Sequence, residues 1–283
     1  MSTDRSRRRF VGTAAVAAAW PLLGRTGAAV SVAPAAGHGP LKLGVASYSM
    51  REFTLDQALD MAKKMGVTHM TFKDVHIPRT DPPEATRALR AKIEAAGITI
   101  MGGGTITIPN DPARIKKEFE YAKNAGFPLI FIDPEPAALD AIEAMARSSD
   151  IKVAIHNHPK GQSIYWNPES VLAAIKGRTP LIGACADVGH WIRSGLDPLE
   201  CLKKLDGHIL SLHFKDLNEM GPNAHDVPWG TGVGRTKELM VELQRQHFRG
   251  VICVEYEYNW ESSSPEIAQS IKFFNKICDE LVG

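Results

Sequence analysis

The sequence predicts a protein of the α/β class that folds as an eight-stranded (β/α)₈ barrel. From about residue 41 to the end of the 283-residue chain, short apolar runs alternate with longer amphipathic runs. Such nearly continuous apolar strands are typical of a parallel sheet that helices cover on its faces. Eight strand–helix units in about 245 residues match a closed barrel. A doubly wound open sheet is the alternative, but Gly102-Gly103-Gly104 lacks the spacing of a dinucleotide-binding turn.

Helix start and stop signals separate the first four units. Thr54 is a good N-cap, and Gly66 and Gly97 are suited to the ends of two helices. Asp111 and Pro112 open another helix, with proline in its preferred first turn. The expected order is strand 41–46, helix 54–65, strand 67–72, helix 83–96, strand 98–101, helix 111–124, strand 129–132 and helix 136–147.

The second four units continue the same alternation. Asn167-Pro168 and Asp197-Pro198 each combine an N-cap residue with a first-turn proline. The expected order is strand 152–155, helix 167–176, strand 181–186, helix 197–205, strand 208–212, a long loop 218–234, helix 236–246, strand 251–254 and helix 265–281.

The first 36 residues differ from the rest in composition. The basic segment Ser6-Arg7-Arg8-Arg9-Phe10 precedes an alanine-rich apolar run and several small residues. This segment resembles a twin-arginine export signal, and its apolar run is too short for a stable membrane-spanning helix. We therefore expect a signal peptide and linker at 1–36, a single catalytic barrel domain at 37–283, and a periplasmic location.

Charge and cysteine content weigh against two broad kinds of protein. The formal net charge is +1, which disfavours nucleic-acid binding through many phosphate contacts. The four cysteines form no C-x-x-C pair, so a zinc-finger site is not indicated. We expect buried free thiols at Cys185, Cys201, Cys253 and Cys278.

Side chains that can bind a metal follow four consecutive predicted strands, each at the end of its strand. The carboxyl ends of barrel strands meet at one mouth, so residues far apart in the sequence converge there. A mixed His, Asp and Glu set predicts one divalent ion, Mn²⁺, Zn²⁺, Co²⁺ or Fe²⁺, although any single one of these groups could equally be a hydrogen-bonded strand end. Lysines follow two of the predicted strands and join these groups as candidate site residues. The full set of candidates is Lys73, His156, His158, Asp187, His190, His213, Lys215 and Glu255.

Four short sequence segments of the chain resemble the sugar phosphate isomerase/epimerase family. These xylose-isomerase-like barrels include ketose 3-epimerases and inosose dehydratases. The resemblance extends from about residue 41 to the end of the chain, and it is more specific for fold and metal than for substrate. The segments are Ala-Asp-Val-Gly-His-Trp (186–191), Leu-His-Phe-Lys-Asp (212–216), Val-Pro-Trp-Gly-Thr-Gly (227–232) and Val-Glu-Tyr-Glu (254–257).

The resemblance implies that residues at the ends of strands five to eight hold one metal ion. Asp187, His213 and Glu255 match the last three family ligands. His156 stands where the family has Glu, and His158 is the other candidate for this place. Ketose 3-epimerases resemble one another in using both metal-bound Glu residues as acid and base. That symmetrical arrangement is not matched here, whereas a lyase or dehydratase needs only one base and a Lewis acid.

Further roles follow from the same resemblance. It implies that His190 contacts a substrate hydroxyl or acts as acid or base, with Glu255 as a catalytic carboxylate. His158 is a candidate ligand, base or orienting residue. Lys73 and Lys215 are candidates to neutralise a developing enediolate, or else to pair with the aspartate that follows each of them.

The sequence thus predicts an exported, metal-dependent isomerase, epimerase or lyase that removes a proton next to the metal-polarised carbonyl of a sugar, polyol or keto-glycoside.

The predicted mouth loops contain three tryptophans, which either stack on a sugar or pack in the core: Trp166, Trp191 and Trp229. A metallo-endonuclease of the abasic-site type and a non-catalytic sugar-binding barrel are the alternatives. The expected partner is a small carbohydrate, not nucleic acid or a membrane, and a homo-oligomer is compatible with the sequence.

Overall fold

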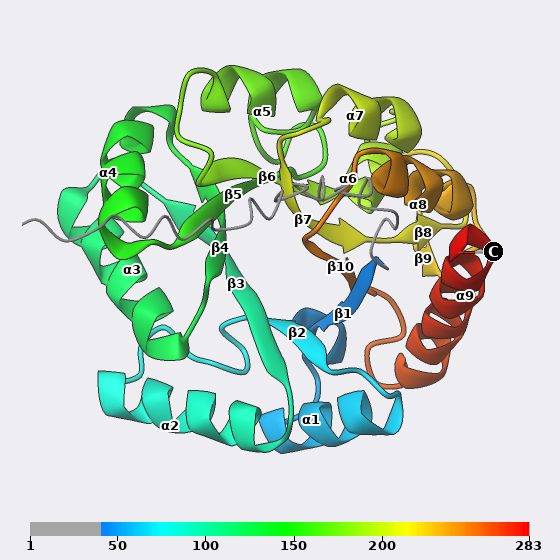
Figure 1. The fold of residues 1–283 in the computed structure, drawn as a ribbon, viewed down its shortest axis with the longest axis horizontal. Coiled ribbons are helices and arrows are strands. Elements are labelled where there is room, and N and C mark those ends of the chain that lie inside the picture. The colour runs from blue at the N-terminus through cyan, green and yellow to red at the C-terminus, as the bar shows by residue number, and fades with distance from the viewer. Residues whose placement is uncertain (1–40, 283) are drawn as a thin grey trace, which may run out of the picture. The chain divides into compact units, whose positions relative to one another are not determined.

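A computed structural model of the protein describes residues 41–282. Eight parallel strands in this range close into a barrel, and helices surround it as an outer ring (Figure 1). The predicted barrel is confirmed, and the export signal predicted for residues 1–36 lies outside the described residues. Closure pairs the first strand with the last, with Lys42 beside Val251. The barrel strands are β1 (Lys42–Ala46), β2 (His69–Phe72), β3 (Thr99–Ile108), β4 (Leu129–Pro134), β5 (Lys152–His156), β6 (Ile182–Asp187), β7 (Ile209–Phe214) and β10 (Val251–Val254).

Local capping signals set the starts of the outer helices. Thr54 forms a capping box with Gln57, in which each side chain accepts a hydrogen bond from the other's backbone N–H. Asp111, Asn167 and Asp197 cap three further helices, each one residue before a proline. The helices are η1 (Ser47–Met50), α1 (Leu55–Lys64), α2 (Pro83–Ala95), α3 (Pro112–Ala125), η2 (Pro136–Ala138), α4 (Leu139–Ser149), α5 (Pro168–Ile175), α6 (Val188–Arg193), α7 (Pro198–Lys204), α8 (Thr236–Arg245) and α9 (Ser264–Val282), with η marking 3₁₀ helices.

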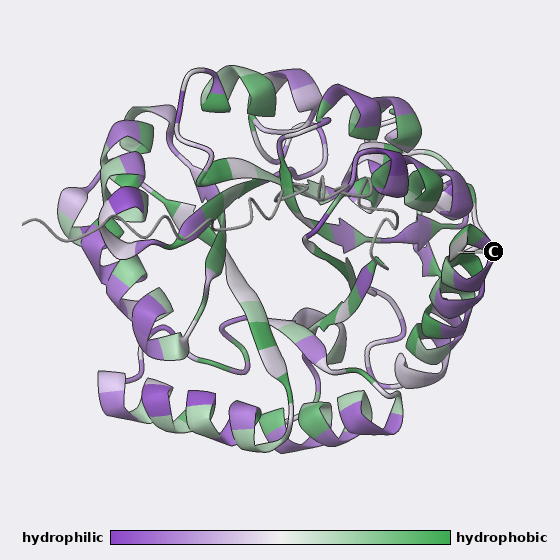
Figure 2. Ribbon diagram, viewed as in Figure 1, coloured by the Kyte–Doolittle hydropathy of each residue, from purple (hydrophilic) through white to green (hydrophobic). Residues whose placement is uncertain are grey.

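The apolar core lies mainly between the barrel and the helix ring. Outer helices carry hydrophobic residues on the side that faces the barrel, such as Leu59 on α1, so both colours appear along them in Figure 2. Within the described residues, three smaller apolar clusters are separate from this core. Because side chains alternate along a strand, Ala154 and Cys185 share the faces of His156 and Asp187 and lie inside the barrel.

The third strand is longer than the sequence predicts. Instead of ending at residue 101, β3 continues through three glycines to Ile108. A Cβ atom on Gly104 would lie 2.3 Å from the carbonyl oxygen of Phe131 on the neighbouring β4. Such a close approach between strands is open only to glycine, so the glycine run extends the strand and does not end it.

A short helix and a two-stranded ribbon on the mouth side are missing from the sequence prediction. Helix α6 follows β6 without a loop, so His190 lies on a helix. The predicted loop 218–234 contains β9 (Asp226–Val227), which pairs antiparallel with β8 (Asp216–Leu217). Among residues 41–282, no helix combines the length and the hydropathy needed to cross a bilayer.

Candidate metal centre and active site

Four side chains converge at the carboxyl ends of four neighbouring strands. His156 ends β5, Asp187 ends β6, His213 lies near the end of β7, and Glu255 directly follows β10. Parallel pairing places His213 beside Asp187 on one side and beside Cys253 on the other. One nitrogen or oxygen atom from each of the four lies within 4.8 Å of those from the other three, and all four residues are buried. The fold therefore brings together the ligand set that the sequence suggests.

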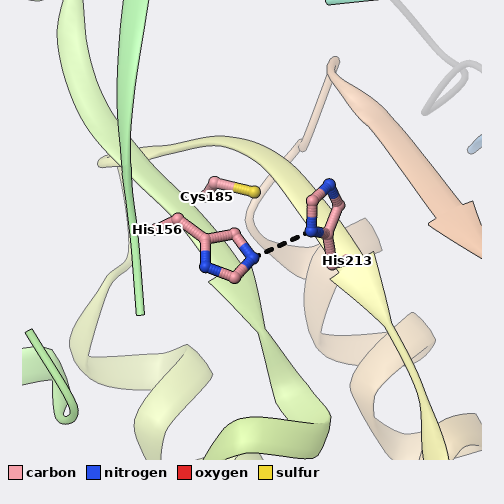
Figure 3. A group of neighbouring side chains, drawn as sticks. All are labelled: His156, Cys185 and His213. Atoms are coloured by element: carbon pink, nitrogen blue, oxygen red, sulfur yellow. Dashed lines mark hydrogen bonds between the residues drawn. The ribbon is translucent and has the colours of Figure 1, made fainter. Parts of the chain in front are cut away.

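Two imidazole rings face each other in this ligand group. His156 Nε2 and His213 Nδ1 share a hydrogen bond of 2.9 Å, as Figure 3 shows. Asp187 Oδ2 is 3.6 Å from His156 Nε2, and Glu255 Oε2 is 3.1 Å from His213 Nδ1. Burial, followed by the nearby His213, holds the pKa of His156 well below its usual value, so this imidazole is neutral. Neutral imidazoles and ionised carboxylates are the forms in which these residues bind metals.

Lys215 places a buried positive charge inside the same group. Its ammonium donates to Asp187 Oδ2 at 2.5 Å and to Glu255 Oε2, and it lies 3.8 Å from Glu257 Oε2. Burial opposes the charge, but Asp187 and Glu255 raise the pKa of Lys215 well above its usual value. Burial also opposes ionisation of Glu255, yet His213 and Lys215 hold its pKa well below the usual value. Lys215 therefore bridges two of the candidate ligands and balances one of their two negative charges.

Asp216 organises the loop that follows β7. The sequence offered Lys215 as its partner, but that lysine pairs with the carboxylates of other strands. A Cβ atom on Gly232 would lie 2.5 Å from Asp216 Oδ1, so the loop wraps tightly around this buried carboxylate. Its two oxygens accept hydrogen bonds from four backbone N–H groups, those of Leu217, Gly230, Gly232 and Gly234.

Replacing Asp216 with Ala is expected to lower the free energy of unfolding by about 3 kcal/mol, because buried N–H groups lose a charged acceptor. Asp216→Asn is also expected to destabilise the protein, since the amide nitrogen of the new side chain would face two backbone N–H donors. Urea unfolding measures the loss. Asp60→Ala is the control, because Asp60 forms an exposed i,i+4 pair with Lys64 that is worth less than about 0.5 kcal/mol. Equal stability of the two alanine variants would contradict this account.

The mouth carries more negative than positive charge. Arg193 contacts Asp226 at 2.7 Å and Glu257 at 3.4 Å, while Lys215 bridges the two ligand carboxylates. With all four carboxylates ionised, this group carries two more negative than positive charges. Burial raises the pKa of Asp226 to about 7 and also raises the pKa of Glu257. A divalent cation in the ligand group matches both this missing charge and the nitrogen and oxygen donors around it.

His190 lies on α6 beside the ligand group. Asp187 Oδ1 accepts a hydrogen bond of 2.9 Å from the His190 backbone N–H and caps the helix, so Oδ2 is left for the ligand group. His190 Nε2 is 3.4 Å from that Oδ2, and Nδ1 is 3.4 Å from Arg193 Nη1. Burial, followed by Lys215, holds the pKa of His190 well below its usual value. Because arginine only donates, the neutral ring accepts at Nδ1 and carries its proton on Nε2.

His158 lies outside the four-ligand group, although it shares a strand face with His156. Its ring stacks on His190 with the centroids 5.7 Å apart, and its Nδ1 is 3.4 Å from Asp133 Oδ2. The side chain is 26% exposed, whereas His156 is 3% exposed. Of the two candidates for the first ligand, the structure therefore places His156 in the group and His158 beside a cavity.

A polar cavity of about 440 Å³ adjoins the ligand group. Lys73 lies in its wall and donates a hydrogen bond of 3.0 Å to the carbonyl of Thr105. Arg193 was not among the predicted site residues, because its spacing of three residues from His190 becomes a signal only once α6 is known. Tyr48 was not predicted either, and no sequence signal marks it as a site residue. The wall includes Tyr48, Lys73, His158, His190, Arg193 and Glu257.

Two of the three predicted mouth tryptophans belong to the core. Trp191 and Trp229 are 1% and 2% exposed, and Trp229 packs edge-on against Phe214. Stacking on a sugar is therefore wrong for these two residues. Trp166 is partly exposed, with Lys160 Nζ 4.9 Å from the centre of its ring.

Comparison with known proteins places this geometry among related barrels. The family model described as xylose isomerase-like TIM barrel matches residues 54–277. The crystal structure of an uncharacterised protein from Parabacteroides distasonis is 33% identical, with a TM-score of 0.66, over 83% of this chain and 98% of that chain. No curated protein matches the chain.

Two further structures are similar in fold alone. A D-tagatose 3-epimerase-like protein is 19% identical, with a TM-score of 0.67, over 86% of this chain and 100% of its own. The IolI protein, solved with a zinc atom, is 16% identical, with a TM-score of 0.69, over 85% of this chain and 99% of its own.

Proposed function

The chain belongs to the xylose isomerase-like TIM barrel family, and from this premise we propose that it is a divalent-metal-dependent carbohydrate lyase that acts on keto-glycosides. The observation that carries the proposal is the convergence of His156, Asp187, His213 and Glu255 beside a polar cavity. An epimerase that works through two metal-bound Glu residues needs a carboxylate where this chain has His156. A lyase removes one proton and expels a neighbouring substituent, so a single base is enough.

The ligand group would hold the metal through two imidazole nitrogens and two carboxylate oxygens. When bound, the ion would polarise the substrate carbonyl next to the proton that is removed. Mn²⁺, Zn²⁺, Co²⁺ and Fe²⁺ all suit such a mixed set. The IolI protein, a barrel of the same fold, was solved with a zinc atom, and this supports a bound metal ion in the present chain.

His158 is the best-placed base in the cavity. With a proton on Nδ1 facing Asp133, its Nε2 is left to accept the proton from the substrate. The Asp133 carboxylate would then stabilise the imidazolium that forms. Glu255 is a weaker candidate for this step, because His213 and Lys215 hold its pKa well below the usual value.

His190 is placed to assist the departing group. Its Nε2 carries a proton because Arg193 faces its Nδ1. In the proposed β-elimination, a proton passes from carbon to His158 and the bond between carbon and the glycosidic oxygen breaks. The departing oxygen takes up the proton that His158 removed from carbon, while the His190 Nε2–H donates a hydrogen bond to that oxygen, which gives a free alcohol and an unsaturated keto-sugar. Lys73 in the opposite wall would bind a substrate oxygen.

NMR of a 3-keto-glycoside in D₂O with metal-loaded protein tests the reaction. We expect release of the alcohol, and we expect His158→Gln to slow it by about 100-fold or more. His208→Gln is the control, because His208 is exposed and lies before β7, at the opposite end of the barrel. Deuterium uptake without release would favour an isomerase or epimerase. Neither release nor uptake, or equal rates for the two variants, would end the proposal.

A further inference from the structure

Cys185 adds a sulfur atom next to the two imidazoles of the ligand group. It lies on the inner face of β6, two residues before Asp187, and is fully buried. Its Sγ and one ring nitrogen each from His156 and His213 lie within 4.8 Å of one another. Figure 3 shows the thiol pointing toward the two rings. Cys185 is a free cysteine, so the sulfur is available to a ligand.

Two ligand groups therefore share one pair of imidazoles. On the mouth side, His156 and His213 meet Asp187 and Glu255; on the side of the barrel interior, they meet Cys185. The sulfur does not belong to the group that contains the carboxylates. An ion bound through the thiolate would consequently occupy a different position from an ion bound through the carboxylates.

The two imidazoles beside Cys185 each have a second ring nitrogen that is unused in the fold. Among the described residues, His156 Nδ1 and His213 Nε2 are buried and have no hydrogen-bond partner, which is rare for buried polar atoms. The thiol itself packs against Leu129 and Phe131 inside the barrel. A dry pocket with a thiol and two imidazoles is a suitable environment for a borderline-soft metal ion.

We propose that His156, Cys185 and His213 form a second metal site, which selects thiophilic ions such as Zn²⁺ or Cd²⁺. Carboxylates prefer harder ions such as Mn²⁺, so the two groups differ in selectivity. Because they share both imidazoles, an ion at one site excludes an ion from the other. Binding converts the thiol to a thiolate, and one proton is released to solvent for each ion taken up. The site does not depend on the proposed lyase reaction.

Co²⁺ bound to the full chain is the direct probe. Co²⁺ bound to a thiolate shows a sulfur-to-metal charge-transfer band in the near ultraviolet, whereas Co²⁺ bound only to nitrogen and oxygen does not. We expect this band in the parent protein, its loss in Cys185→Ser, and its retention in Cys253→Ser. Cys253 is the matched control, because it is also a buried thiol of a barrel strand but belongs to neither ligand group.

Metal affinities separate this site from the carboxylate-containing group. Cys185→Ser should weaken Cd²⁺ binding at least about tenfold, or about 1.4 kcal/mol, and leave Mn²⁺ binding unchanged. A parent protein that binds Co²⁺ and Cd²⁺ with no sulfur-to-metal charge-transfer band for either ion overturns the proposal, and these spectra require no variant to fold. A band that persists in Cys185→Ser also overturns it, as does an equal loss of Cd²⁺ and Mn²⁺ affinity. If instead the proposed metal centre of His156, Asp187, His213 and Glu255 were wrong, the parent protein would not bind Mn²⁺.

Discussion

Replacing Glu255 with Gln is expected to abolish tight metal binding and to lower turnover at least about a thousandfold. The substitution keeps the size of the side chain but removes a charged ligand, and polarisation of a carbonyl by a metal is worth several kcal/mol in the transition state. The amide nitrogen would also face the ammonium of Lys215, which now donates to the carboxylate. Metal per chain and the rate of alcohol release from a keto-glycoside measure the two effects.

Glu261→Gln is the matched control for this variant. Glu261 follows the same strand, β10, but its side chain is exposed, so we expect one ion per chain and unchanged turnover. A Glu255→Gln protein that keeps both one tightly bound ion and parental turnover would show that the four-ligand group is not the active centre. Three ions per chain in the parent would instead favour the endonuclease alternative.

Replacing Lys215 with Met is expected to destabilise the metal-free protein by about 3–5 kcal/mol, because two buried carboxylates lose their common cation. The same change should tighten metal binding, since an ion no longer shares Asp187 and Glu255 with an ammonium. Metal should therefore stabilise the variant more than it stabilises the parent, as ligand linkage requires. Urea unfolding with a chelator and with Mn²⁺, together with calorimetric titration of Mn²⁺, measures both effects.

Lys73→Met provides the comparison for the Lys215 variant. Lys73 also follows a barrel strand and faces the same mouth, but among the described residues its ammonium contacts a carbonyl oxygen and the Tyr48 ring and no carboxylate. Its loss should cost about 1 kcal/mol and leave the metal affinity unchanged. If Lys215→Met were as stable without metal as Lys73→Met, Lys215 would not be the counter-charge of the ligand group.

Short-range signals account for the success of the element prediction. Thr54, Asp111, Asn167 and Asp197 each cap the helix that the sequence assigned to them. A cap depends on hydrogen bonds within the first turn, so it can be read from adjacent residues. The failures arise where distant backbone decides the outcome: β3 passes through three glycines because β4 lies against it at Phe131.

Two strand ends each carry two candidate residues that are two positions apart. The role of each residue depends on how far along the barrel axis it lies. His156 and His158 share one strand face, so alternation cannot tell which of them meets the other ligands. The register of β5 against β6 places His156 beside Cys185, within reach of His213, and leaves His158 at the cavity. Lys215 likewise lies two residues after the candidate ligand His213. Only closure of the barrel brings its ammonium between the carboxylates of Asp187, at the end of β6, and Glu255, after β10.

The sequence by itself determined the barrel and the residues that end its last four strands, because periodicity, caps and strand ends are properties of neighbouring residues. Only the tertiary structure decided which of these residues meet. It assigned His156 to the ligand group, paired Lys215 with Asp187 and Glu255, and placed Cys185 beneath the shared imidazoles. These contacts join strands that are distant in the chain, and they depend on register and closure, which no local pattern encodes.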